Sequence, residues 1–226
     1  MMQKTWAAAL FAAFSLLLTA CGAPATEQAT QGSYATITDD NGRTVTFDKK
    51  PERIVVTSAS FLEPLYAVGG TVVGRPDSKS KIPEAAKSAT NIGRVYQIDV
   101  EKVLALTPDL VILNRGMNEK LVETLAANNV KTLVLDMKSY ADVKIGIFAA
   151  LTGEKAKGEE LVRKMDADIE AVRTSIPQEK KRVAIIHSTG QGLSVQLDGS
   201  IAGSIANMLG WENTASGMPA LDKNPD

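Results

Sequence analysis

Residues 154–175 read EKAKGEELVRKMDADIEAVRTS, and their pattern sets the architecture predicted for the whole chain. Apolar residues recur here at steps of three and four, with mostly charged residues between them; they are Leu161, Val162, Met165, Ile169, Val172 and Ile176. This spacing predicts an amphipathic helix with one apolar face. Pro177 ends the helix, because proline cannot continue a helix and disfavours helical geometry in the residue before it.

The predicted helix has two interpretations. At 1.5 Å per residue it would be roughly 33 Å long, about the width of a small domain. One interpretation is a surface helix of a single domain, and the other is a connector between two lobes. The flanking sequence favours the connector, because strands alternate with helices before it and the strand pattern restarts after it.

Residues 34–138 are predicted to form a doubly wound α/β lobe. It opens with a β-hairpin at 34–47, which alternates around Asn41-Gly42, a pair that favours the positive φ of tight hairpin turns. Four apolar runs suited to buried parallel strands follow at 54–57, 72–75, 110–113 and 132–135. Helices are predicted between them at 61–68, 99–107 and 118–128. This alternation implies parallel pairing with right-handed crossovers.

Residues 139–177 are predicted to be a helix pair, in which a helix at 141–151 precedes the long one. Residues 178–226 begin a second α/β lobe, with strands at 183–186 and 193–197 and a helix at 200–209. These elements are too few to complete a sheet, so we expect a partial, truncated second lobe. The predicted fold class is therefore α/β, with two doubly wound lobes joined by one long α-helix.

Residues 1–20 have the features of an export signal. Lys4 supplies a positive start, and the apolar run after it is too short for a comfortable membrane span. The tetrapeptide LTAC at 18–21 resembles the lipobox of bacterial lipoproteins, which implies cleavage before Cys21 and lipidation of that cysteine. Residues 21–33 are mostly small and polar, as expected of a flexible tether. We expect an exported protein, anchored by its lipid to the outer face of the cytoplasmic membrane.

The overall composition excludes some classes of function. The formal net charge is −1 and no basic stripe appears, so nucleic acid is not expected as a partner. A hydrophobic share of 44% and a charged share of 23% are ordinary for a soluble globular protein. Cys21 is the only cysteine, so the chain has no internal disulfide. We expect a monomer.

Three segments carry a resemblance to a known family: RIVVTSASFLEPLYAVGGTVVGRPD at 53–77, NIGRVYQIDVEKVLALTPDLVILNRG at 91–116 and LTGEKAKGEELV at 151–162. They resemble the helical-backbone substrate-binding proteins of ABC importers for iron-siderophores, haem or cobalamin, and residues 114–136 look particularly like cobalamin-binding members. The resemblance covers roughly Pro51 to Ser216. It implies two lobes at either end of one long helix, a metal chelate as ligand in the cleft between them, no cofactor, and a transmembrane permease as partner.

Candidate ligand-binding residues follow from sheet geometry, because open α/β sheets bind ligands beyond the carboxyl ends of their strands. The residues at those ends are Ser60, Phe61, Arg75, Asn114, Arg115, Met117 and His187. The resemblance adds the loop before the helix at 99–107, with Arg94 and Tyr96. Arginine offers planar donors for carboxylates or phosphates, and Tyr96 offers a flat apolar face with a polar tip.

Glu101 is the candidate for docking to the permease. By the resemblance it matches the first-lobe glutamate that meets an arginine on the permease. The alternative is an ordinary exposed acid in the first turn of a helix, where the helix dipole favours negative charge. We expect the second-lobe counterpart to lie beyond Asp226.

Two other functions compete with this one. A bare metal-ion importer subunit shares the two-lobe plan but needs several imidazole, thiolate or carboxylate ligands, and His187 with a lipidated Cys21 cannot build such a site. An exported α/β hydrolase-like enzyme is less favoured. Gly199-Ser200 lacks the G-x-S-x-G spacing, and Gly190-Gln191-Gly192 lacks the third glycine of a dinucleotide-binding turn. We therefore expect a binding protein that is not an enzyme and has no metal site of its own.

Overall fold

The computed structural model describes residues 32–136, 144–176, 179–189 and 192–219. The predicted signal peptide, Cys21 and most of the tether lie outside these ranges. Within the described residues, no helix combines the length and the apolar character that crossing a membrane requires.

A five-stranded parallel sheet forms the centre of the α/β part. Its strands are β3 (Ile54–Val56), β4 (Gly74–Arg75), β5 (Thr90–Asn91), β8 (Leu110–Asn114) and β9 (Lys131–Leu135), in the spatial order β5-β4-β3-β8-β9. Every neighbouring pair is parallel. The chain builds outward from β3 in one direction and then from β8 in the other, so the strand order reverses between them. The predicted doubly wound α/β arrangement is confirmed here.

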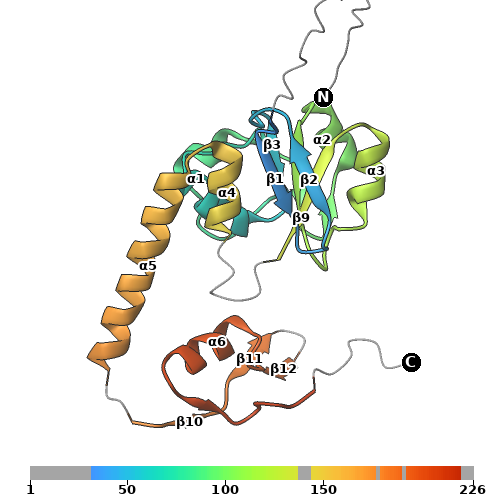
Figure 1. Ribbon diagram of the computed structural model, residues 1–226. Coiled ribbons are helices and arrows are strands. Elements are labelled where there is room, and N and C mark those ends of the chain that lie inside the picture. The colour runs from blue at the N-terminus through green and yellow to red at the C-terminus, as the bar shows by residue number, and fades with distance from the viewer. Residues whose placement is uncertain (1–31, 137–143, 177–178, 190–191, 220–226) are drawn as a thin grey trace, which may run out of the picture. The chain divides into compact units, whose positions relative to one another are not determined.

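Both faces of this sheet are buried, which explains why its strands are continuous apolar runs. Along β3, Ile54 and Val56 belong to one core cluster and Val55 to the other, as expected from the alternation of side chains in a strand. Figure 1 shows helices on opposite sides of the sheet: α1 (Leu62–Ala67) and α4 (Ile145–Thr152) on one, α2 (Val100–Ala105) and α3 (Leu121–Ala127) on the other.

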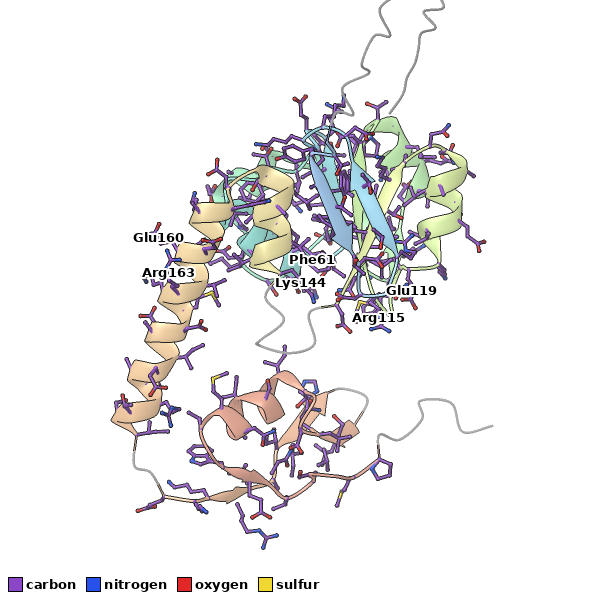
Figure 2. The ribbon with its side chains drawn as sticks, in the orientation of Figure 1. Phe61, Arg115, Glu119, Lys144, Glu160 and Arg163 are labelled. Atoms are coloured by element: carbon purple, nitrogen blue, oxygen red, sulfur yellow. The ribbon has the colours of Figure 1, made fainter. Side chains whose placement is uncertain are left out.

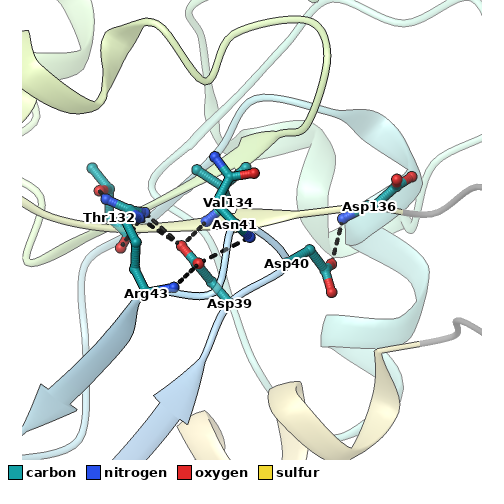
Figure 3. A network of polar contacts seen from close by, with 7 residues as sticks. All are labelled: Asp39, Asp40, Asn41, Arg43, Thr132, Val134 and Asp136. Atoms are coloured by element: carbon teal, nitrogen blue, oxygen red, sulfur yellow. Dashed lines mark hydrogen bonds and ion pairs between the residues drawn. The ribbon is translucent and has the colours of Figure 1, made fainter.

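The predicted β-hairpin is confirmed as β1 (Ala35–Thr38) paired antiparallel with β2 (Thr44–Phe47). A buried carboxylate ties its turn to β9 (Figure 3). Asp39 accepts hydrogen bonds from Val134 N at 3.0 Å and from Arg43 N at 2.9 Å, and its carboxylate pairs with Arg43 Nη2 at 2.6 Å. Burial opposes ionisation of this carboxyl, but these hydrogen bonds and the guanidinium charge outweigh that cost and lower the pKa of Asp39.

We expect Asp39→Asn to destabilise the fold by about 2–3 kcal/mol, because the amide leaves several of these donors without an oxygen partner. Chemical denaturation of the variant would measure the loss. Asp48→Asn is the matched control, since the Asp48 side chain is 89% exposed and its replacement is expected to change stability by less than about 0.5 kcal/mol. Equal effects at the two sites would contradict a structural role for Asp39.

The contribution of Asp39 to folding stability should depend on pH. Its folded-state pKa is lower than its unfolded-state pKa of about 3.9, so its contribution is fully present above that value and is lost as the pH falls toward the folded-state pKa. The stability difference between the wild type and Asp39→Asn should therefore shrink in acid below about pH 4.

The long helix is α5 (Lys155–Ser175), which confirms the predicted helix within one residue. It follows α4 through Gly153, which takes a φ of +79°. Gly158 is buried against α4, where an added Cβ would lie 2.5 Å from the Ala149 Cβ, so the two helices pack closely. Farther along the predicted apolar face, Leu161 and Met165 pack on the core, whereas Val172 is 56% exposed.

The segment 179–219 has its own short elements. Strand β10 (Arg182–Val183) pairs in parallel with β13 (Glu212–Asn213), and β11 (Ile186–Thr189) pairs antiparallel with β12 (Gly192–Val195). The predicted single strand at 183–186 is wrong, because its two ends pair with different partners. Helix α6 (Ile201–Met208) is confirmed, with the Ser200 hydroxyl accepting a hydrogen bond from Gly203 N at 3.0 Å.

Candidate ligand-binding site

The candidate site begins where the strand order reverses. Val56 ends β3 and pairs with Ile112 of the neighbouring β8, which continues to Asn114. Because the two strands are parallel neighbours, the segments that follow them begin at the same edge of the sheet. We call this edge, at the carboxyl ends of β3 and β8, the switch-point edge; doubly wound sheets place their ligands there.

A buried asparagine that sequence reasoning did not select joins three segments at this edge. Asn118 is 3% exposed, and its Oδ1 accepts hydrogen bonds from Asn114 N at 2.8 Å and from Thr57 Oγ1 at 2.5 Å. Its Nδ2 donates to Val95 O at 2.5 Å. Asn118 thus ties the end of β3, the end of β8 and the loop at residue 95 together. Asn114 ends a buried strand, and the asparagine four residues later was the available signal in the sequence.

The loop at residue 95 is the tip of a small hairpin made by β6 (Gly93–Arg94) and β7 (Gln97–Ile98). Gly93 is required at its base, because its φ is +103° and an added Cβ would lie 2.5 Å from Gln97 O. The hairpin exposes two of the predicted ligand-binding side chains, since Tyr96 in the turn is 80% exposed and Arg94 at the end of β6 is exposed as well.

A hollow of about 200 Å³ lies between this hairpin and the turn that follows β8. Its walls include Tyr96 and Met117, both predicted from the sequence, and the buried Asn118. Met117 keeps 42% of its surface exposed. The structure therefore brings the hairpin tip and the turn after β8 together on one surface.

Arg115 lies on the same turn and is exposed. Glu119, labelled with Arg115 in Figure 2, accepts a hydrogen bond from Gly116 N at 3.2 Å, which fixes the turn. The backbone N–H of Arg115 donates to Leu135 O at 3.0 Å, but its guanidinium is left for other partners. In the part of the chain that the structure describes, neither Arg94 nor Arg115 forms an ion pair.

Arg75, in contrast, is occupied by the fold. Its Nε donates to Ala86 O at 2.9 Å and its Nη1 to Pro76 O at 3.2 Å, which fastens the short 3₁₀ helix η2 (Glu84–Ser88) to the sheet. A guanidinium whose donors serve backbone carbonyls has little left for a ligand. Arg75 is therefore not part of the candidate site.

The two candidates after β3 differ from each other. Both lie in the 3₁₀ helix η1 (Ala59–Phe61), where Ser60 is exposed. Phe61 is completely buried, and its ring meets Phe148 edge to face at a centroid distance of 6.2 Å. The sequence prediction of Phe61 as a ligand contact is corrected here, because the first residues after a strand include one that turns back into the core.

His187 lies in β11 and is exposed. It pairs with Ser194 across the β11–β12 hairpin, and Ser194 Oγ donates to its carbonyl at 3.5 Å. Among the described residues, no group of three or more histidine, cysteine, aspartate or glutamate side chains is arranged to hold a metal ion. A role of His187 in ligand contact stays a prediction.

Glu101 stands in the first turn of α2. The helix is capped by Asp99, whose carboxylate accepts a hydrogen bond from Lys102 N at 3.1 Å; this bond lowers the pKa of Asp99. Because α2 leads into β8 and covers the sheet, its first turn lies toward the carboxyl edge of the strands. Glu101 is exposed there, and the described residues offer it no ion-pair partner.

A second hollow, of about 480 Å³, lies between α4 and α5. Its walls are mostly the small and apolar side chains of these helices, including Ala149, Ala150 and Val162. Arg163 also lines this hollow, but all of its lining residues come from these two helices, and none follows the carboxyl end of a strand of the sheet.

Comparison with known proteins assigns the fold to a family. The model of a family described as periplasmic binding protein matches residues 54–224. The chain belongs to this family. The match runs from the first residue of β3 through the segment 179–219, so it includes the edge that carries Asn118 and the hairpin tip.

Two known proteins are similar in sequence to this chain over most of its length. The uncharacterized ABC transporter substrate-binding lipoprotein YvrC of Bacillus subtilis is 28% identical, over 93% of this chain and 72% of its own length. The Fe(3+) dicitrate-binding periplasmic protein FecB of Escherichia coli is 29% identical, over 83% and 66%.

A solved structure extends the comparison to three dimensions. The iron uptake ABC transporter substrate-binding protein PiuA from Streptococcus pneumoniae matches with a TM-score of 0.69 at 22% identity, covering 80% of this chain and 67% of that one. At this identity the likeness shows a shared fold. The chain spans 66–72% of the length of these three proteins.

Proposed function

We propose that this protein is the extracytoplasmic substrate-binding component of an ABC importer, and that it captures a ferric chelate. The observation that carries the proposal is the pair of exposed arginines, Arg94 and Arg115, on the two segments that Asn118 joins at the switch-point edge. Neither has an ion-pair partner in the described part of the chain. Two such guanidinium groups, with the exposed Tyr96 on the same hairpin as Arg94, suit an anionic ligand with a flat or apolar portion.

Among chelates, the carboxylate type fits these residues best. Arginine binds carboxylates through two parallel hydrogen bonds, and the phenol of Tyr96 can donate a further one. The family relative FecB is named for binding Fe(3+) dicitrate, which is a chelate of this chemistry. Haem and cobalamin are the alternatives within the same proposed function.

The proposed cargo is delivered to a membrane permease. YvrC is named as a lipoprotein, and the LTAC sequence at 18–21 supports the same kind of anchor on Cys21. We propose that Glu101 contacts the permease and that α5 connects the lobe to the remainder of the protein. The half-exposed Val172 supports a connector, because a helix covered along its length by one domain would bury that side chain.

A ligand panel tests the proposed function. The full chain would be titrated with ferric citrate, a ferric catecholate, haem, cobalamin, Zn²⁺ and Mn²⁺, following the fluorescence of its tryptophans and tyrosines. We expect saturable binding of one chelate and none of the bare ions. Binding of Zn²⁺ or Mn²⁺ alone would favour a metal-ion importer subunit, and no binding across the panel would overturn the proposal.

We expect Glu101→Lys to reduce uptake of the chelate by cells at least about tenfold while leaving its affinity for purified protein unchanged, because a reversed charge at a docking contact costs several kcal/mol. Radioactive iron uptake in cells that lack other copies of the gene measures the effect. Glu52→Lys is the control, since Glu52 is exposed but precedes β3 at the opposite, amino edge of the sheet. Normal uptake by the Glu101 variant would remove the docking role.

A further inference from the structure

The side chain of Asn118 has only one orientation that satisfies its neighbours. Asn114 N–H requires an oxygen, at 2.8 Å, and Val95 C=O requires an N–H donor, at 2.5 Å. An amide rotated by 180° would place donor against donor and acceptor against acceptor. An aspartate has nearly the same shape but cannot donate to Val95. Asparagine is therefore the residue type that this position calls for.

Asn118 connects to the hairpin at its tip and not at its base. The base has its own contacts, because Asp77 N donates to Gly93 O at 2.7 Å and Asp99 N donates to Ile92 O at 2.8 Å. Val95 belongs to the two-residue turn between β6 and β7, and its carbonyl is the group that Asn118 holds.

The tip has room to move if this hydrogen bond is lost. The hollow of about 200 Å³ lies against the tip and is lined by Val95, Tyr96 and Met117. A loop that borders open space depends on specific hydrogen bonds for its position, since packing alone does not define it.

We infer that Asn118 is a positioning residue, which holds the 93–98 hairpin so that Arg94 and Tyr96 are presented to the ligand before it arrives. Fixing a binding loop in advance removes the cost of ordering it during binding, so affinity should fall when the tie is cut. The role in affinity rests on the proposed function, whereas the anchoring of the tip does not.

Hydrogen exchange on the ligand-free full chain tests the anchoring. In Asn118→Asp and Asn118→Ala, the amides of residues 95–97 should exchange at least about tenfold faster, with the strands of the sheet unchanged. Both variants are expected to fold, because Thr57 Oγ1 still accepts from Asn114 N at 3.1 Å. Asn128→Asp, the same replacement at an exposed asparagine, should leave the tip unaffected. Unchanged exchange at 95–97 in both variants would overturn the inference.

A double-mutant cycle tests the role in binding, with ferric citrate or whichever panel chelate binds the wild type most tightly. Asn118→Asp should weaken binding about tenfold in the wild type and have no further effect in an Arg94→Ala, Tyr96→Ala background, because the tip then carries nothing to position. An equal loss in both backgrounds, or no loss in either, would overturn the positioning role. If the wild type binds no chelate, the proposed function fails, and hydrogen exchange alone decides whether Asn118 holds the tip.

Discussion

Replacing Arg94 and Arg115 together by glutamine is expected to weaken binding of ferric citrate by about a hundredfold or more. A hydrogen bond to a charged group contributes about 1.5–3 kcal/mol, and each 1.4 kcal/mol corresponds to a tenfold change in affinity. Glutamine retains some length and polarity at both positions but loses the charge and the paired donors. Isothermal titration calorimetry of the variant beside the wild type measures the difference.

Arg163→Gln provides the matched control for this experiment. Arg163 is an exposed arginine on α5, 4.0 Å from Glu159, and it lies outside the switch-point edge (Figure 2). Its replacement should leave affinity unchanged. If the double variant binds as tightly as the Arg163 variant, the two arginines do not contact the ligand and the proposed carboxylate chemistry is wrong.

Phe61→Ala is expected to destabilise the fold by about 3–5 kcal/mol, since it removes a fully buried aromatic side chain from the core. The edge-to-face contact with Phe148 is lost as well. Thermal or chemical denaturation measures the loss. Ligand affinity of the folded fraction should stay unchanged, in contrast to the arginine variants. A stable Phe61→Ala protein with weakened binding would restore Phe61 as a ligand contact.

Much of the fold could be predicted because its signals are local. The apolar runs of β3, β8 and β9 are buried on both faces, so burial requirements and sequence pattern coincide. The periodicity of α5 and the turn at Gly42 are equally local. Within the candidate site, the rule of the carboxyl edge selected Asn114, Arg115 and Met117; the structure places Met117 in the wall of the hollow, and a ligand contact of all three stays a prediction.

The features that the sequence did not predict depend mostly on contacts between residues far apart in the chain. Whether Phe61 faces the ligand side or the core is decided by Phe148, 87 positions later. Asn118 acts through Thr57, 61 residues away, and Val95, 23 residues away. The strand predicted at 183–186 is divided because β10 pairs with β13, about 30 residues later, whereas β11 forms a hairpin with β12.

A hydrogen-exchange footprint of the chelate on the full chain locates the binding site. With saturating ferric citrate, or the panel chelate that binds best, exchange should slow at residues 93–98 and 114–118. Exchange at the amino edge, at residues 47–51, should not change. Protection at the amino edge with none at the hairpin tip and the turn after β8 would show that the chelate binds elsewhere.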